Sequence, residues 1–231
     1  MIVKQLIDED FVNYKKASML IGFPSCTFKC EKDSNCPGIC QNRDFAKAPN
    51  IEISVDKIIN RYLDNNITSS IVCAGLEPFD SFEDLYNLIK YLRIDKENND
   101  DIIIYTGYNK TEILDKLLLI SKYDNIIIKY GRFVPGDKLH FDDILGINLS
   151  SDNQYGEILK PMNYKIIKNS SLSHTEIGDI VNKIKLNDGY CPCRLEKTTD
   201  TLCMCKEFKD FIKDKKLGDC HCGLYSTIIS E

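Results

Sequence analysis

Ala-Ser-Met-Leu-Ile-Gly-Phe-Pro-Ser-Cys-Thr-Phe-Lys-Cys, at residues 17–30, joins a short apolar segment to a pair of cysteines. The apolar residues 17–23 predict a strand, and Pro24 marks the start of a loop that holds Cys26 and Cys30. Open α/β sheets and barrels bind ligands in the loops at the carboxyl ends of their strands. This segment therefore predicts a strand followed by a ligand-binding loop that contains two thiols.

Segments typical of strands and helices alternate along the chain up to residue 130. Residues 101–105 read DIIIY, which is apolar and β-branched at its centre, as expected for a parallel strand covered on both faces. Further strands are expected at 69–73 and 126–129, with helices after Ser54, after Ser81 and over 111–121. We expect an α/β domain with mainly parallel strands over residues 1–159.

A second domain is expected over residues 160–231. Ser173-His174-Thr175-Glu176 is a capping box, and this motif predicts the start of a helix. The helix leads into three pairs of cysteines near the end of the chain. We therefore expect a small, cysteine-rich, helical domain.

The composition is that of an ordinary globular protein with an unusual number of cysteines. Of 231 residues, 43% are apolar and 28% are charged, and the net charge of −5 gives no general attraction for nucleic acid. No apolar run is long enough to span a membrane, and the first ten residues lack a signal peptide. We therefore expect a cytoplasmic protein without nucleic acid or membrane partners. Eleven Cys in a reducing compartment indicate metal or redox chemistry.

Four cysteines follow the first expected strand. Cys26 and Cys30 can bind one iron–sulfur cluster together, and Cys36 or Cys40 can complete a set of three ligands. Three thiolates would leave one iron of a [4Fe–4S] cluster open to a small molecule. The alternative is a zinc knuckle that uses all four cysteines.

Five segments carry a resemblance to one family. The loop Phe23-Pro24-Ser25-Cys26-Thr27-Phe28-Lys29-Cys30, with Cys40-Gln41-Asn42, resembles the cluster loop of radical SAM anaerobic ribonucleotide reductase activating proteins. Further similar segments follow in the family's order: Gly75-Leu76-Glu77-Pro78, Tyr105-Thr106-Gly107-Tyr108, Gly131-Arg132-Phe133 and Ser150-Ser151-Asp152-Asn153-Gln154. The resemblance extends over residues 17 to about 156.

This resemblance implies a compact partial barrel and a definite chemistry. A [4Fe–4S] cluster on Cys26, Cys30 and Cys40 would pass an electron to S-adenosylmethionine (SAM), and the resulting adenosyl radical would abstract a hydrogen from a glycine of a partner enzyme. The SAM-binding residues that it implies are Gly75, Glu77, Pro78 and Thr106. A ferredoxin or flavodoxin is the expected electron donor.

The chain departs from the family pattern at two places. Nine residues separate Cys30 from Cys40, where the family has two, so Cys36 stays an alternative third ligand. Leu76 replaces a glycine of the family's segment, and a Leu side chain that points inward would weaken SAM binding.

The last six cysteines form three C-x-C pairs. In an extended C-x-C segment the two side chains project to opposite sides, so one sulfur can bind a cluster while the other exchanges disulfides. Zinc bound by four of these thiolates is the alternative. The pairs are Cys191-Pro192-Cys193, Cys203-Met204-Cys205 and Cys220-His221-Cys222.

These pairs resemble the catalytic chain of ferredoxin–thioredoxin reductase over residues 173–226, although Met204 replaces the middle Pro. The resemblance implies a second [4Fe–4S] cluster and a redox disulfide between Cys193 and Cys222, with His221 placed to move a proton. The cluster ligands that it implies are Cys191, Cys203, Cys205 and Cys220. Thioredoxin becomes a possible partner.

The resemblances together lead us to expect a two-cluster oxidoreductase that activates a glycyl-radical enzyme such as anaerobic ribonucleotide reductase. The C-terminal domain would transfer electrons or reduce thiols. One alternative is a ferredoxin-dependent disulfide reductase, and another is a zinc-binding interaction module.

Overall fold

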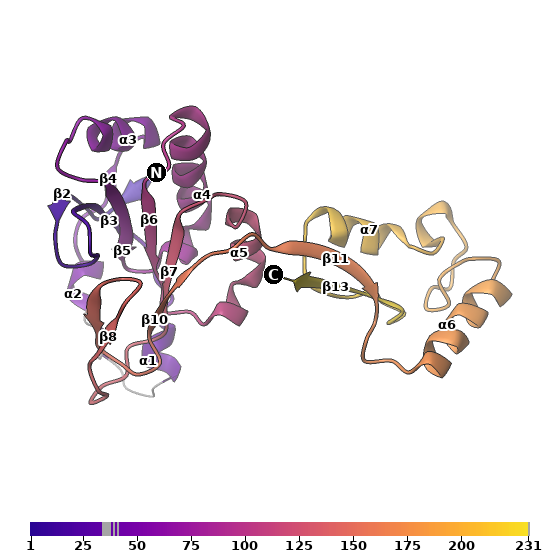
Figure 1. Ribbon diagram of the computed structural model, residues 1–231. Helices are drawn as coiled ribbons and strands as arrows, with labels where there is room; N and C mark the ends of the chain where they lie inside the picture. Colours follow the sequence, from indigo (N-terminus) through magenta and orange to yellow (C-terminus); the bar gives the residue numbers. More distant parts are fainter. Residues whose placement is uncertain (34–37, 39, 41, 231) are drawn as a thin grey trace. The chain divides into compact units, whose positions relative to one another are not determined.

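A computed structural model describes residues 1–33, 38, 40 and 42–230. The chain divides into two compact units, Met1–Lys160 and Pro161–Glu231 (Figure 1). Cys36, the alternative third ligand of the first cluster, lies outside the described residues. Within the described ranges, no helix has the length and apolarity needed to cross a membrane.

The first unit is built on a six-stranded sheet. Its order is β10-β7-β6-β5-β3-β2; the four central strands are parallel, and the two edge strands pair antiparallel with their neighbours. The strands are β2 (Gln5–Asp10), β3 (Ser18–Phe23), β5 (Ser70–Gly75), β6 (Asp101–Tyr105), β7 (Ile126–Tyr130) and β10 (Tyr155–Ile158). The expected α/β architecture with mainly parallel strands is confirmed.

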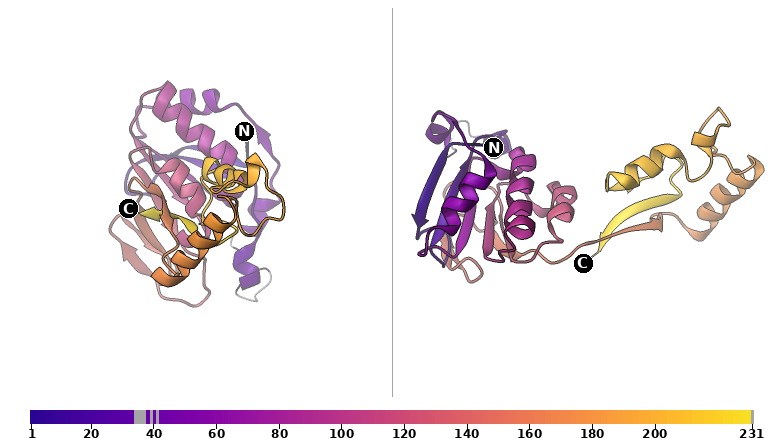
Figure 2. Two further views of the ribbon diagram at one scale, coloured as in Figure 1. Left: turned by 90° about the vertical axis from the view of Figure 1, so that its right-hand side faces the viewer. Right: turned by 90° about the horizontal axis from the view of Figure 1, so that it is seen from above.

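Both faces of this sheet are covered, which explains its apolar strands. On one face, Leu20, Val72, Ile103 and Ile127 pack against Leu145 and other residues of the loops that follow β7. Successive parallel strands joined by right-handed crossovers place their helices on a common face. Those helices are α3 (Val55–Leu63), α4 (Phe82–Lys90) and α5 (Leu114–Ile120) (Figures 1 and 2).

Short elements complete the first unit. Two antiparallel pairs form small sheets, and two short helices follow β3. They are β1 (Ile2–Val3) with β4 (Ile51–Glu52), β8 (His140–Asp142) with β9 (Ile147–Leu149), α1 (Lys29–Asp33) and α2 (Arg43–Ala46). The helices α1 and α2 flank the predicted third cluster ligand.

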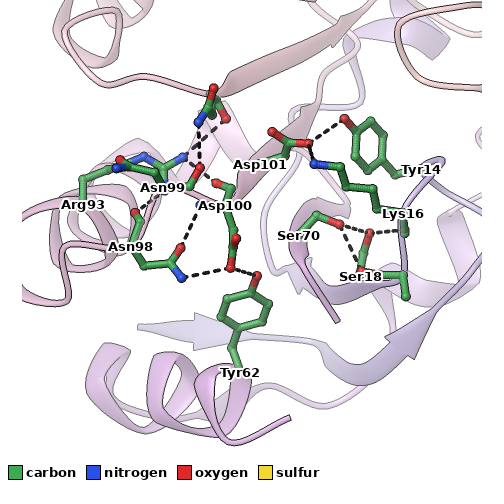
Figure 3. A network of polar contacts seen from close by, with 12 residues as sticks. Tyr14, Lys16, Ser18, Tyr62, Ser70, Arg93, Asn98, Asn99, Asp100 and Asp101 are labelled. Atoms are coloured by element: carbon green, nitrogen blue, oxygen red, sulfur yellow. Dashed lines mark hydrogen bonds and ion pairs between the residues drawn. The ribbon is translucent and has the colours of Figure 1, made fainter. Parts of the chain in front are cut away.

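A polar network joins the amino ends of the central strands (Figure 3). The guanidinium of Arg93, which is only 8% exposed, donates hydrogen bonds to backbone carbonyls that precede β6 and β7. The acceptors belong to Asn98, Asp100, Asp124 and Asn125. Tyr62 donates from its hydroxyl to the Asp100 carboxylate at 2.7 Å. The amino ends of the central strands are therefore closed by structural contacts, and the motif residues lie at the carboxyl ends.

The second unit contains an antiparallel sheet, which corrects the expectation of a helical domain. The sheet has the order β11-β13-β12, and α7 lies along it (Figure 2). Its elements are β11 (Asn163–Lys168), α6 (His174–Leu186), α7 (Lys206–Lys213), β12 (Gly218–Asp219) and β13 (Tyr225–Ser230). The register pairs Asn163 with Ser230, so a strand at the start of the unit needs the last strand of the chain as its partner. Such a distant pairing is not visible as local periodicity.

The helix expected after the capping box is confirmed. Ser173 Oγ accepts a hydrogen bond from Glu176 N–H at 3.2 Å, and the Glu176 carboxylate accepts one from Ser173 N–H at 2.8 Å. The apolar face of α6 packs against Phe208 of α7, Leu224 and two cysteines, Cys205 and Cys220. The cysteines of this unit are therefore part of its small core.

Candidate functional site

The cysteine loop begins where β3 ends. Cys26 follows Phe23, the last residue of β3, by three residues, and its sulfur accepts a hydrogen bond from Phe28 N–H at 3.2 Å. Phe28 has φ of +52°, so the chain turns sharply there before α1 begins at Lys29. This turn brings Cys26 close to Cys30, which lies in the first turn of α1.

Cys30 lies against the end of β6. A Cβ atom placed on Gly107 would be 3.0 Å from Cys30 Sγ and 3.7 Å from Glu77 Oε2. Glycine is therefore the residue that leaves room for both groups. The loop after β3 and the ends of β5 and β6 all meet at this point.

Cys40 is held by contacts on both sides of it. Its N–H donates a hydrogen bond to Glu31 Oε1 at 3.2 Å, and Glu31 also pairs with Arg43. The side-chain amide of Asn42 donates to the Gly75 carbonyl at 2.7 Å. The segment with Cys40 is thus attached to α1 and to the end of β5.

Burial controls the acidity of Cys26 and Cys30. It raises the pKa of Cys26 to about 12; the Phe28 N–H opposes the shift, and the negative charges of Glu77 and Cys30 reinforce it. Burial also raises the pKa of Cys30, with Cys40 acting in the same direction. Metal ligation requires the thiolate, so a bound metal must replace these protons.

Glu77 is a buried carboxyl group at the centre of the site, where the carboxyl ends of β5 and β6 meet the cysteine loop. It is 5% exposed, and its carboxylate accepts hydrogen bonds from Phe79 N–H at 3.1 Å and Gly107 N–H at 2.9 Å. Its own N–H donates to the Ser25 carbonyl at 2.8 Å. Burial raises the pKa of Glu77 to about 7, although the N–H donors lower it. Glu77 therefore joins the cysteine loop to the ends of β5 and β6.

The rest of the Gly-Leu-Glu-Pro segment forms a tight turn. Gly75 has φ of +92°, and a Cβ atom on it would be 2.9 Å from the Cα of Gly22, so a glycine is required. Leu76 is half-buried. Pro78 is buried and starts the 3-10 turn Pro78–Ser81, which Glu77 caps.

The Thr-Gly-Tyr segment contacts both the acid and the loop. Thr106 is buried, and its hydroxyl accepts a hydrogen bond from Tyr108 N–H at 3.0 Å and donates one to Glu77. The Tyr108 hydroxyl donates to Asp80 at 2.7 Å, and Asp80 accepts a further hydrogen bond from Thr27 N–H at 2.8 Å. Thr27 lies next to Cys26, so this segment fixes the cysteine loop from a second side.

An ion-pair network fixes α1. Arg132, of the Gly-Arg-Phe segment, pairs with Asp33 and Glu112, each at 2.9 Å, and Glu112 also pairs with Lys29. Lys29 and Asp33 are the first and last residues of α1. The helix that carries Cys30 is therefore tied to the residues that follow β6 and β7.

The motif segment 150–154 packs on the motif segment 131–133. Gln154 Nε2 donates to the Gly131 carbonyl at 3.3 Å, and Gln154 Oε1 accepts from Ser150 N–H at 3.1 Å. Gly131 has φ of +98°, and a Cβ atom on it would be 2.4 Å from the Asn153 carbonyl oxygen. All five segments of the resemblance therefore lie around the carboxyl ends of the parallel strands.

The donor set suits an iron–sulfur cluster. Cys26, Cys30 and Cys40 provide three thiols, and Cys30 lies close enough to each of the other two for their charges to interact. Among the described residues, no three Cys, His, Asp or Glu side chains converge closely enough to bind a single metal ion. Each cysteine ligand of a [4Fe–4S] cluster binds its own iron, so the ligands of a cluster need not converge on one point.

The comparison with protein families identifies this domain. Residues 18–154 match the family described as the 4Fe-4S single cluster domain. The chain belongs to this family. The match runs from β3 to the last motif segment, and it makes residues 18–154 an iron–sulfur cluster domain of the radical SAM type. No curated protein matches the chain.

In the second unit, a small cavity lies among the cysteine loops, next to Phe208 of α7 and Tyr225 of β13, outside the range matched by the 4Fe-4S single cluster domain family. Its lining includes all four predicted ligands of a second cluster: Cys191, Cys203, Cys205 and Cys220. Cys222 lines the same cavity, with its sulfur 3.5 Å from Cys220 Sγ. Phe208 and Tyr225 form an apolar wall.

Local backbone pairing brings these cysteines together. Cys191 N–H donates to the Thr201 carbonyl at 2.8 Å, and Cys203 N–H donates to the Gly189 carbonyl at 2.9 Å. These bonds hold the first two C-x-C pairs side by side. In the third pair, Cys220 Sγ accepts from Tyr225 N–H at 3.2 Å.

The two predicted redox thiols differ in their surroundings. Cys193 is exposed and lines a second pocket of about 690 Å³ beside Arg194 and Lys206, and this pocket shares Cys205 with the small cavity. Cys222 is half-buried, and burial raises its pKa to about 12. His221, the predicted proton carrier, is exposed.

Three contact residues were missed by the sequence predictions. Asn42 bonds the end of β5, Asp80 bonds the cysteine loop, and Glu112 pairs with Lys29 and Arg132. Asn42 had a usable signal, because it directly follows Cys40-Gln41 in the motif. Asp80 and Glu112 had none, since each acts on a segment distant in sequence.

Proposed function

We propose that this protein activates a glycyl-radical enzyme by reductive cleavage of SAM, with anaerobic ribonucleotide reductase as the favoured partner. A [4Fe–4S] cluster would supply the electron for this cleavage when bound to Cys26, Cys30 and Cys40. A ferredoxin or flavodoxin would supply the electron to the protein. This proposal adds a specific activity and partner to the membership in the 4Fe-4S single cluster domain family.

One observation carries the proposal: Cys30, Glu77 and Gly107 come together where three strand ends meet. Radical SAM chemistry needs the cluster and SAM in contact at a site protected from water. The thiol of a proposed ligand lies beside the buried acid of the proposed SAM-binding segment. Sites at the carboxyl ends of parallel strands are the usual ligand sites of such sheets.

The chain's own residues would position SAM rather than react with it. Gly75 allows the backbone to approach a ligand closely, and the Thr106 hydroxyl and Glu77 carboxylate provide polar groups beside it. Pro78 fixes the turn that orients Glu77. The half-buried Leu76 would take the place of a glycine at the wall of this site.

The direct test is formation of a glycyl radical. The full chain, reconstituted anaerobically with iron and sulfide, is incubated with SAM, a reductant and the anaerobic ribonucleotide reductase from the same source. The proposal predicts the doublet of a glycyl radical in the electron paramagnetic resonance spectrum. It also predicts loss of the doublet in Cys30→Ala, whereas the matched control Cys73→Ala, in the core of β5, keeps it. A wild-type protein that cleaves SAM but leaves this reductase without a radical would reassign the partner.

For the C-terminal unit we propose a second [4Fe–4S] cluster on Cys191, Cys203, Cys205 and Cys220, with Cys193 and Cys222 as redox thiols. The shared cavity favours this second function, and so does the exposure of Cys193, because disulfide exchange requires an accessible thiol. The unit would pass electrons or reduce thiols on the partner.

Metal content separates this proposal from its rivals. Two clusters predict about eight iron atoms per chain and no zinc. A disulfide reductase acting on thioredoxin would keep its activity in Cys30→Ala and lose it in Cys193→Ser. A zinc-binding module would contain zinc after purification and would lose its fold with a chelator.

A further inference from the structure

A lysine lies in the interior of the first unit. Lys129 pairs in register with Tyr105 across β6 and β7, two residues after Ile127 of the buried cluster on that face. It is only 7% exposed. Lysine is almost never buried to this extent unless its charge is compensated.

The neighbours of Lys129 compensate its charge poorly. Its ammonium group donates to the Gly131 carbonyl at 3.2 Å and lies 5.8 Å from the centre of the Tyr105 ring. No carboxylate of the described residues forms an ion pair with it. Burial lowers the pKa of Lys129 to about 8, while the charges of Cys30 and Glu77 raise it. The lysine therefore lies in the electrostatic field of a proposed cluster ligand.

Backbone contacts connect Lys129 to that ligand. Thr106 N–H donates to the Lys129 carbonyl at 2.8 Å, and the next residue, Gly107, lies against Cys30 Sγ. Arg132 is also near Cys30, but Asp33 and Glu112 neutralise its charge at 2.9 Å each. Of these two cations, Lys129 is the one whose charge is left for another partner.

We propose that Lys129 is the buried counter-charge of the first cluster and stabilises its reduced form. This inference rests on the proposed function, because it needs a cluster on Cys26, Cys30 and Cys40. A [4Fe–4S]²⁺ cluster with three thiolates has a net charge of about −1, and one electron from a low-potential reductant changes it to about −2. No bond forms or breaks, and Lys129 keeps its proton. A fixed positive charge in a buried site favours the more negative state.

The size of the effect follows from Coulomb's law. At an effective dielectric constant of about 20, a unit charge changes a one-electron equilibrium tenfold at separations up to roughly 12 Å. The Lys129 carbonyl bonds Thr106 N–H, the next residue Gly107 lies against Cys30, and the charge of Cys30 acts on the Lys129 ammonium, so we take a separation within that range. Removal of the charge should therefore lower the ratio of reduced to oxidised cluster at least tenfold at a fixed potential, which equals about 59 mV.

The test is a redox titration of the full chain, followed by electron paramagnetic resonance of the reduced cluster. Cys203→Ser/Cys205→Ser serves as the common background, so that a cluster in the second unit does not contribute. Lys129→Met removes the charge and keeps the length of the side chain. Lys122→Met is the matched control, because Lys122 is exposed and bonds the hydroxyl of Tyr86. We expect the tenfold loss in Lys129→Met and no change in Lys122→Met.

Three results would overturn the inference. The first is an equal potential in Lys129→Met and Lys122→Met, both carrying a full cluster. The second is a shift that occurs only with SAM bound, which would assign Lys129 to the SAM carboxylate. The third is loss of iron from both Lys129→Met and Lys129→Gln, which would make the lysine structural. Absence of the cluster from the background protein itself would refute the proposed function instead.

Discussion

The contact between Gly107 and Cys30 makes a sharp prediction for Gly107→Ala. The new Cβ atom would lie 3.0 Å from Cys30 Sγ, several tenths of an ångström closer than an ordinary contact. Overpacking of this kind costs about 1–3 kcal/mol of stability. If the sulfur moves instead, its shift exceeds the roughly 0.2 Å tolerance of metal–ligand distances. Either way, Gly107→Ala should bind less iron at the first cluster.

Two measurements check this prediction. Denaturant unfolding of the reduced, metal-free protein gives the stability cost in the transition of the first unit, and iron per chain after anaerobic reconstitution gives the loss of the cluster. Gly178→Ala is the matched control, because Gly178 lies within α6 and a Cβ atom there would meet nothing within 4 Å. That substitution should stabilise α6 by about 0.5–1 kcal/mol and leave iron unchanged. Wild-type iron and wild-type stability in Gly107→Ala would refute the proposed position of Cys30.

Two further predictions concern the ion pairs of α1 and the exposed thiol. Hydrogen bonds from Arg132 lower the pKa of Glu112 to about 2, so its contribution to stability is present above its ordinary pKa of 4.5 and is lost as the pH falls toward 2. Glu112→Gln should remove this part of the pH dependence of the free energy of unfolding. The loss should be about 1 kcal/mol at most, because the ion pairs are partly exposed. An unchanged acid unfolding curve would contradict this prediction. In the reduced protein, iodoacetamide should label the exposed Cys193 before Cys222, as mass spectrometry of peptides would show; equal labelling rates would contradict the assigned roles.

Much of the first unit could be predicted from the sequence because its signals are local. The Ile-rich segment of β6 has to be covered on both faces, and a strand that runs directly into Cys26 places the thiol at a strand end. The motif segments then collect at one edge, because parallel strands all end there. The strand expected at 69–73 lies within β5, where Cys73 is fully buried.

The features that were missed depend on pairings distant in sequence. The strand β11 pairs with the last strand of the chain, so its stability comes from a partner that local periodicity cannot reveal. Asn42 likewise bonds Gly75, and Glu112 pairs with Lys29 of α1 and with Arg132. The buried charge of Lys129 was also hidden, because a single lysine in an apolar segment is equally compatible with the exposed end of a strand.

The account depends most directly on SAM cleavage at the first cluster. The measurement is 5′-deoxyadenosine formed by the anaerobically reconstituted full chain with SAM and dithionite, compared among wild type and the variants Cys26→Ala, Cys30→Ala, Cys36→Ala and Cys40→Ala. The account predicts product from wild type and Cys36→Ala, and none from the other three. Full activity in Cys40→Ala with loss in Cys36→Ala would show that Cys36, not Cys40, is the third ligand. Absence of 5′-deoxyadenosine from an iron-loaded wild type would contradict the central claim.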